Sequence, residues 1–295
     1  MATAHDGCYT FKKITYSRGF LNDSTDATYI LTMDGSHRIS EVYKQLEQYQ
    51  PTTTVYIVFN KGYKKCKKSL PVQNSIYDIT HASIEIFKHA NNNNYNNILL
   101  LEDDFKFSEK ILKNNIIIYL NDFLIKRKDI SFVYQLGCTP VLMIPYDLSS
   151  YIAYYTYNTH ACIYSRIFRN TMIDQPTETI TDWDLDVSRI ANTNLSKFTY
   201  YEPLCVQTAE QTDNRATWGS DPVVKFISDT VISTFKLDTD PAPGTNTIYM
   251  FAKILSFLVL LFICFIIYYT YRILNTYVFN GSQRGTRTRS GNRRR

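Results

Sequence analysis

The chain has 295 residues, enough for one ordinary domain with attachments or for two small domains. Hydrophobic residues make up 44% and charged residues 20%, which excludes an intrinsically disordered chain. Eight of the 32 Lys and Arg residues follow residue 247, where there is no Asp or Glu, so the first 247 residues carry 24 basic and 27 acidic side chains. A mildly acidic globular part gives no overall charge argument for nucleic-acid binding, and the basicity belongs to the C-terminal tail.

The first half of the chain alternates between strand and helix patterns. Residues 1–28 are mixed and polar, and we expect an irregular lead-in there. Continuous apolar runs predict buried strands, and apolar spacings of three and four predict helices. The strands are expected at 29–33, 55–59 and 97–101, and the helices at about 39–49 and 79–90. This order predicts an α/β fold with a mostly parallel sheet covered by helices on both faces.

The second half is less regular. A further helix, three short strands and a helix that ends near Met172 are expected. The first helix covers about 108–126, and the strands cover 132–135, 141–144 and 160–164. Two prolines and a glycine within 239–247 indicate a linker. We therefore expect a lead-in at 1–28, one domain at 29–235, a linker at 236–247, a transmembrane helix at 248–273 and a tail at 274–295.

Residues 254–271 contain no charged side chain. A helix of this length is about 27 Å long at roughly 1.5 Å per residue, close to the thickness of a bilayer core. Lys253 and Arg272 flank the run, and tyrosines such as Tyr249 and Tyr268 fall near its ends, as interfacial aromatics do. The pattern predicts a single-pass C-terminal anchor in contact with membrane lipid, in a host membrane or a virion membrane. A buried core helix is the alternative.

The tail contains arginines and no acid from residue 284 to residue 295. Such a tail can bind anionic lipid headgroups, fix membrane topology, or contact nucleic acid inside a particle. The N-terminus has no apolar core of signal-peptide length, and a C-terminal anchor then predicts a cytosolic domain with a translocated tail. The positive-inside rule predicts the reverse orientation. We expect the cytosolic domain.

The six cysteines, Cys8, Cys66, Cys138, Cys162, Cys205 and Cys264, show no close spacing typical of a metal site. We expect them to be reduced and structural. N-glycosylation sequons begin at Asn22, Asn194 and Asn280. These patterns matter only for segments that reach a glycosylating compartment.

Three carboxylates, Glu102, Asp103 and Asp104, end the third predicted strand. Ligands of open α/β sheets bind at the carboxyl ends of strands, so these acids lie where chemistry is expected. Three like charges repel one another, and Mg²⁺ or Mn²⁺ would offset that repulsion with oxygen ligands. Glu102 and Asp104 would point the same way from an extended chain, which makes them the predicted metal ligands. An acidic surface turn is the alternative.

The stretch from Asp78 to Ala90, the asparagine loop at 91–94 and the apolar strand that ends in Glu-Asp-Asp resemble the core of family 25 glycosyltransferases. That family includes lipooligosaccharide and procollagen galactosyltransferases. Further segments fit the same frame, and the resemblance covers roughly residues 29–220. These segments are 29–34 with Arg38, 159–165 and 202–207.

The chain departs from the family pattern at three points. The first-strand motif reads Thr32-Met33-Asp34 where the family usually has Asn-Leu-Asp, and Thr80-His81 replaces Ser-His at the helix start. No histidine follows His160, so the late histidine metal ligand of some such enzymes has no counterpart. We expect His160 to be a core residue, and the lysines around Cys66 to form a solvated loop.

The resemblance implies a GT-A type domain in which the acidic motif binds Mn²⁺ (or Mg²⁺) and the diphosphate of a nucleotide sugar. Glu102 and Asp104 would then hold the metal. The implied donor-binding residues are Asp34, Arg38, His81 and Asp103. His81 is equally explained as a histidine packed on the sheet.

Sugar transfer needs a general base that takes the proton of the acceptor hydroxyl. Asp182 and Asp184 lie where the family places an acidic residue near the acceptor, and Trp183 between them would offer a face for sugar stacking. The alternative is an acidic helix start with Asp182 as its cap.

The sequence therefore predicts a membrane-anchored, metal-dependent, inverting hexosyltransferase. It would transfer galactose or glucose from a UDP-sugar to a hydroxyl of a glycan, lipid or protein. One alternative is a catalytically inactive relative with a structural role, for example in a virion. Another is a membrane protein whose arginine tail contacts nucleic acid.

Overall fold

The computed structural model describes residues 7–180, 182–208, 222–237, 239, 242 and 244–287. The chain divides into two compact units, Met1–Ala252 and Lys253–Arg295, which are treated separately below. The first unit is globular and contains every sheet strand of the described chain.

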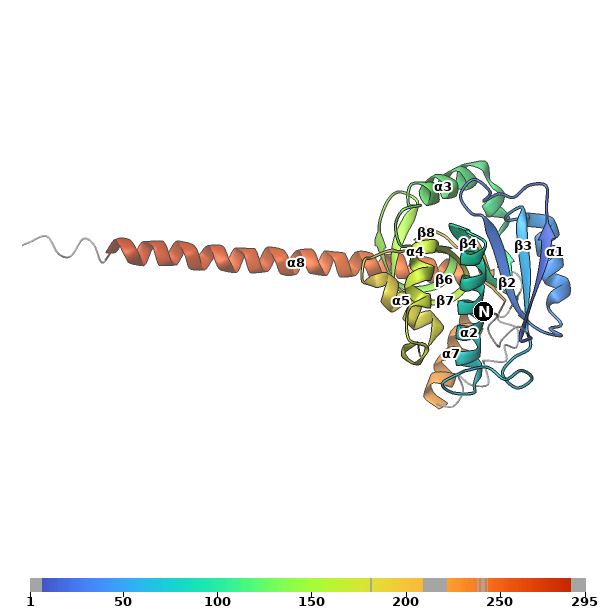
Figure 1. The fold of residues 1–295 in the computed structure, drawn as a ribbon. Helices are drawn as coiled ribbons and strands as arrows, with labels where there is room; N and C mark the ends of the chain where they lie inside the picture. Colours follow the sequence, from blue (N-terminus) through green and yellow to red (C-terminus); the bar gives the residue numbers. More distant parts are fainter. Residues whose placement is uncertain are drawn as a thin grey trace, which may run out of the picture. The chain divides into compact units, whose positions relative to one another are not determined.

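A seven-stranded sheet with the order β1-β3-β2-β4-β7-β6-β8 forms the centre of the globular unit (Figure 1). Its strands are β1 (Tyr9–Thr15), β2 (Ala27–Met33), β3 (Thr54–Asn60), β4 (Asn97–Glu102), β6 (Val133–Pro145), β7 (Ser150–Ser165) and β8 (Lys197–Tyr200). Strands β3, β2 and β4 are parallel, whereas β1 and β7 join them antiparallel. A two-stranded sheet pairs β5 (Phe105–Phe107) with β9 (Cys205–Gln207). The predicted α/β class is confirmed, with a mixed sheet.

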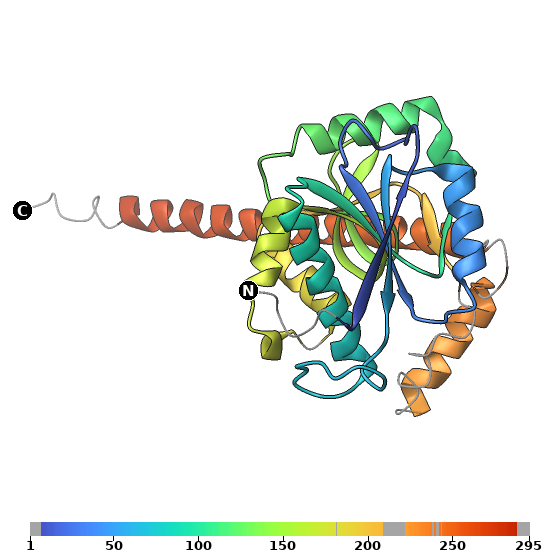
Figure 2. The same cartoon turned by 45° about the vertical axis from the view of Figure 1, so that its right-hand side comes forward.

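Helices cover both faces of the sheet. The helices of the described chain are α1 (Ile39–Tyr49), α2 (Ser75–Asn92), α3 (Asn114–Ile125), α4 (Arg166–Ile173), α5 (Trp183–Asn192), α7 (Pro222–Phe235) and α8 (Gly244–Arg287), with 3₁₀ turns at Glu109–Leu112 and Thr177–Thr179. Apolar side chains of α1 and α3 pack in one core cluster with the sheet, and those of α2, α4 and α5 pack in the other. Figure 2 shows α1 (blue) and α2 (teal) on opposite sides of the strands.

Strand alternation explains the two layers. In β4, Leu99 and Leu101 belong to the α1/α3 layer, while Ile98 and Leu100 belong to the α2/α4/α5 layer. Both sets are almost fully buried, which is why the strand reads as one continuous apolar run. By the same alternation Glu102 follows Ile98 and Leu100 onto the face covered by α2, α4 and α5.

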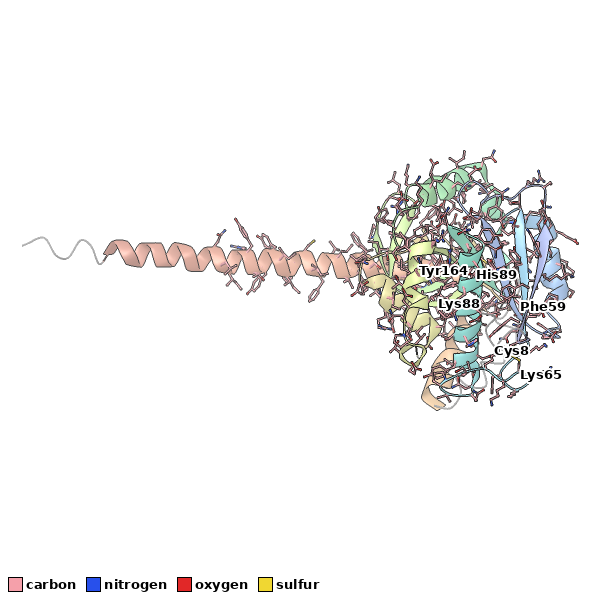
Figure 3. The ribbon with its side chains drawn as sticks, viewed as in Figure 1. Cys8, Phe59, Lys65, Lys88, His89 and Tyr164 are labelled. Carbon is pink, nitrogen blue, oxygen red and sulfur yellow. A yellow bond between two sulfur atoms is a disulfide. The ribbon has the colours of Figure 1, made fainter. Side chains whose placement is uncertain are left out.

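The expected irregular lead-in is wrong for residues 9–15, which form the edge strand β1 antiparallel to β3. A disulfide joins Cys8, directly before β1, to Cys66 in the loop after β3. The expectation that these two cysteines are reduced is therefore wrong. Figure 3 labels Cys8 near Lys65 of that loop. The other four cysteines are free thiols, as predicted.

The two short strands expected at 132–135 and 141–144 form one long strand, β6, paired with a long β7. Register shifts interrupt the pairing between Gln135 and Ile144, and such irregularities obscured the continuous pattern in the sequence. The turn between these strands is held by Asp147, whose Oδ1 accepts hydrogen bonds from the backbone N–H groups of Ser149 and Ser150.

Helix α8 contains a segment, Gly244–Asn275, that is long and apolar enough to cross a membrane. Its first turns belong to the globular unit. Tyr249 is 1% exposed, and its hydroxyl lies 3.2 Å from Cys138 Sγ and 3.2 Å from Thr199 Oγ1. Tyr249 is therefore a core residue, contrary to the expectation that it is an interfacial aromatic.

Candidate functional site

The parallel strands bring three chain segments to one edge of the sheet. Leu31 of β2 pairs with Glu102 of β4, and Met33 of β2 pairs with Asn60 of β3. The residues that follow these strands therefore emerge together, at the carboxyl edge where open α/β sheets place their ligands. The acidic motif lies at this edge, as the sequence predicts.

Asp103 anchors the loop that follows β2. Its Oδ2 accepts hydrogen bonds from Thr32 Oγ1 at 2.6 Å and Ser36 Oγ at 2.9 Å, and its Oδ1 accepts one from Arg38 at 3.0 Å. Arg38 and Asp103, both predicted donor-binding residues, are thus in direct contact. The arrangement fixes the Arg38 guanidinium over the acidic motif, where it also lies 3.7 Å from Asp104 Oδ2.

Asp104 lies in the turn between β4 and β5. Its Oδ2 accepts a hydrogen bond from Gln207 Nε2 at 3.0 Å, and its backbone oxygen accepts one from the Thr208 N–H at 2.9 Å. Strand β9, which carries Gln207, crosses close to Gly137, where a Cβ would lie 1.7 Å from the Cys205 oxygen. Burial raises the pKa of Asp104 to about 6, against the opposing effects of Gln207 and Arg38.

Glu102 and Asp184 lie close enough for their charges to interact. Burial raises the pKa of Glu102 well above its ordinary value, and the charges of Asp104, Asp184 and Asp103 raise it further. Asp184, in the first turn of α5, accepts hydrogen bonds from Thr159 Oγ1 at 2.5 Å and from the Asn158 N–H at 2.9 Å. Burial also raises the pKa of Asp184. Both carboxyl side chains remain half-buried, so neither is sealed in the core.

The extended-chain argument for Glu102 and Asp104 does not hold, because β4 ends at Glu102 and Asp104 lies in a turn. The two side chains still interact electrostatically. The structure therefore gathers Glu102, Asp103, Asp104 and Asp184 at one edge of the sheet, with Arg38 as the cation that contacts two of them.

The structure bears on the predicted roles of two residues at the start of α5. Asp182 is the helix N-cap, and its Oδ1 accepts a hydrogen bond from the Leu185 N–H at 3.0 Å. Trp183 is 5% exposed and packs with its ring 5.7 Å from Phe87 and 6.4 Å from Tyr164, which is labelled in Figure 3. A buried indole offers no face to a sugar, so the expected stacking role of Trp183 is wrong.

Hydrogen bonds connect Asp34 to β3 and His81 to β1. Asp34 is exposed directly after β2, and its N–H donates to the Asn60 oxygen at 2.8 Å. His81 on α2 lies with its Nδ1 2.8 Å from the Tyr9 hydroxyl and stacks on the Tyr9 ring. Asp34 therefore lies at the carboxyl edge of the sheet, while His81 is packed against β1.

A buried charged group that sequence reasoning missed lies beside this edge. Lys68, expected in a solvated loop, is 3% exposed and forms an ion pair with Asp78 of α2. Asn60, the last residue of β3, donates to Asp78 Oδ2 at 3.1 Å and accepts from Lys68 Nζ at 2.5 Å. The network holds the loop after β3 against α2, and nothing in the lysine-rich sequence distinguishes Lys68 from its exposed neighbours.

His160 and Lys197 are two further buried titratable residues of the globular unit. His160 is 3% exposed, as expected for a core residue, and burial lowers its pKa to about 4. Lys197 is fully buried and donates from Nζ to Thr156 Oγ1 at 3.0 Å and Ser188 Oγ at 2.5 Å. Burial lowers the pKa of Lys197 to about 8, although the charge of Asp184 acts in the opposite direction.

The lowered pKa of Lys197 predicts a pH-dependent stability. Between pH 8 and pH 10.5 the unfolded chain binds the lysine proton and the folded chain does not, so stability rises with pH across this window. We expect wild-type protein to gain up to about 3 kcal/mol relative to Lys197→Met over this range, from ~1.36 kcal/mol per pKa unit. Denaturant unfolding of the detergent-solubilised chain at each pH measures the difference. Parallel pH profiles of the two proteins would contradict it.

The chemistry of these acids fits a divalent cation. Asp104 Oδ1 is buried without a hydrogen-bond partner among the described residues. The raised pKa values of Glu102 and Asp104 show that their negative charge is costly here, and a cation would offset that cost. Within the described ranges no three His, Cys, Asp or Glu side chains form a ready metal cluster. One or two carboxylates completed by water and phosphate oxygens are the usual ligand set of Mg²⁺ at such sites.

Comparison with known proteins adds no relative. No protein-family model matches the chain, and no curated protein sequence matches it significantly.

Proposed function

We propose that the chain is a metal-dependent glycosyltransferase of GT-A type that transfers a hexose from a nucleotide diphosphate sugar to a hydroxyl acceptor. One observation carries the proposal. Glu102 ends a parallel strand at the carboxyl edge of the sheet, and Asp103 and Asp104 follow it in the turn, with Arg38 held over these two and Asp184 interacting with Glu102. The resemblance of the 78–105 segment to family 25 glycosyltransferases supports the same function.

The residues divide into a donor side and an acceptor side. Glu102 and Asp104 would hold Mn²⁺ or Mg²⁺, which neutralises the charge of a diphosphate leaving group. Asp103 fixes Arg38, which places a cation beside the diphosphate, and exposed Asp34 lies at the same edge for contact with the nucleotide. In an open α/β sheet these positions correspond to the ligand-binding edge.

Asp184 is the general base of the proposed reaction. A carboxylate with a raised pKa accepts a proton near neutral pH more readily than an ordinary aspartate does. Its proton comes from the acceptor hydroxyl. The acceptor oxygen forms a bond to the anomeric carbon as the bond from that carbon to the diphosphate oxygen breaks, and the nucleoside diphosphate leaves. Attack opposite the leaving group gives inversion, which the family resemblance also implies.

UDP release tests the donor half of this proposal. The full chain is used in detergent, because Tyr249 and Ala252 of α8 belong to the core of the globular unit. We expect UDP release from UDP-galactose or UDP-glucose that requires Mn²⁺ and stops with chelator. Asp104→Asn keeps a side-chain oxygen that can accept the hydrogen bond from Gln207 but removes the carboxylate charge. We expect this variant to abolish metal-dependent release.

The matched control is Asp26→Asn, which alters a carboxylate that accepts hydrogen bonds from the N–H groups of Asn96 and Asn97 at the amino end of β4. Release by folded Asp26→Asn and loss by Asp104→Asn support the donor site. Failure of the wild-type chain to bind UDP with Mn²⁺, despite a native fold, would favour the inactive structural relative.

A further inference from the structure

The disulfide between Cys8 and Cys66 points to an oxidising compartment. It joins the start of the edge strand β1 to the loop after β3. Disulfides form and persist on the exported side of membranes and are rare in the cytosol, where thiols are kept reduced. The globular unit therefore carries a feature typical of proteins outside the cytosol.

The remaining cysteines of the globular unit fit the same compartment. Cys138, Cys162 and Cys205 are at most 3% exposed. Burial raises the pKa of each of these thiols, so each stays protonated and unreactive at neutral pH. Among the described residues of this unit, every cysteine is thus either paired or sealed in the core. In an oxidising compartment these buried, protonated thiols would not form further disulfides.

The charges that flank the apolar segment of α8 indicate the same orientation independently. Residues 234–253 precede the uncharged run 254–271 and contain two basic and two acidic residues. Residues 272–295 follow that run and contain seven arginines and no acid. Lys and Arg near the ends of a span are retained on the cytosolic side. The arginine-rich tail is therefore expected in the cytosol, and the globular unit on the opposite side.

We propose that α8 spans the membrane with its arginine-rich tail in the cytosol and the globular unit in an oxidising lumen or outside the cell, and that Asn194 is N-glycosylated there. This orientation reverses the one expected from the sequence. Asn194 begins the sequon Asn-Leu-Ser in the exposed turn after α5. Asn22, in the other sequon of the globular unit, is held by a hydrogen bond from the Thr53 N–H to its Oδ1 at 2.8 Å.

The chain contains its own control for this proposal. The third sequon, at Asn280, follows the apolar segment and lies with the tail on the cytosolic side in the proposed orientation. Oligosaccharide transfer occurs only on the lumenal side, so Asn194 and Asn280 cannot both be modified in one orientation. Glycosylation at one of them therefore reports the topology without any measurement of transferase activity.

The experiment expresses the full chain, with an epitope tag after residue 295, in cultured eukaryotic cells. Sealed microsomes are treated with protease, and extracts with an N-glycosidase. We expect the tag to be digested and the globular unit protected. We expect a glycosidase-sensitive mobility shift that Asn194→Gln reduces and Asn280→Gln leaves intact, and Cys8 and Cys66 should resist alkylation until a reductant is added.

A protected tag with a digested globular unit would overturn the orientation, as would a glycan lost in Asn280→Gln. A protected globular unit without any glycan at Asn194 supports the orientation and overturns the modification site. Because protease protection does not depend on sugar transfer, loss of the proposed activity leaves these outcomes unchanged.

Discussion

Replacing Arg169 by methionine is expected to lower the free energy of unfolding by about 3–5 kcal/mol. Arg169 is fully buried in α4, and its guanidinium donates to the backbone oxygens of Tyr95, Asn96 and Tyr164 at 2.6–3.0 Å, and to Asn91 Oδ1. Burial lowers its pKa to about 10, so it stays charged at neutral pH. Methionine fills similar volume but leaves these acceptors without a donor.

Arg166→Met is the matched control, because Arg166 begins the same helix but makes a 3.4 Å contact to Asn94 Oδ1 at the surface. A change within about 0.5 kcal/mol is expected for such a surface contact. Denaturant unfolding of the detergent-solubilised chain compares the two variants. Equal, small losses of unfolding free energy in both variants would show that the acceptors around Arg169 find other partners, and would contradict the prediction.

The Arg169 network also shows which parts of the fold the sequence could predict. Helix α1 was predicted with its observed bounds, because Val42 and Leu46 repeat at helical spacing. In the structure Gln50, in a left-handed conformation, ends the helix. Strands β2, β3 and β4 were predicted because doubly covered strands are apolar throughout. The asparagine run was predicted as a loop, which is wrong for Asn91 and Asn92, because α2 continues through Asn92. Asn91 Oδ1 accepts a hydrogen bond from the guanidinium of Arg169, 78 positions later, and no local sequence pattern predicts this contact.

The missed strand β1 has a different cause. It lies at the sheet edge, so Tyr9 and Phe11 pack on one core cluster while Thr10, Lys12 and Lys13 are turned outward or left partly exposed. A short strand with one polar face looks like an irregular polar segment when the pattern is read over residues 1–28. Edge strands commonly carry lysine on their open side, which weakens the pattern further.

The candidate site was predicted only in part, for a topological reason. The acidic motif follows from the strand that it ends, and Arg38 follows from the loop after the neighbouring parallel strand. The approach of Asp184 to Glu102 depends on the antiparallel insertion of β7 beside β4, which places Thr159 and Asn158 under α5. That insertion depends on long-range pairing, and no spacing within residues 102–184 encodes it. The burial of Trp183 depends on the same packing.

The largest expected effect on activity belongs to Asp184. If Asp184 takes the proton of the acceptor hydroxyl, Asp184→Asn removes that base and should lower transfer by roughly 10²–10⁴-fold. Metal-dependent binding of UDP should persist, because Arg38, Asp103 and Asp104 keep their contacts. UDP release from UDP-galactose or UDP-glucose, with water as the acceptor, measures the first quantity, and UDP titration with Mn²⁺ measures the second.

Asp182→Ala separates this role from a structural one, because Asp182 caps the same helix. Loss of a cap costs about 1 kcal/mol of stability and should leave the rate per folded molecule unchanged. Asparagine at 184 can still accept one of the two hydrogen bonds, from Thr159 or from the Asn158 N–H, so a native fold is expected. If Asp184→Asn keeps full activity, or loses UDP binding together with turnover, Asp184 positions α5 or the donor site and another group is the base.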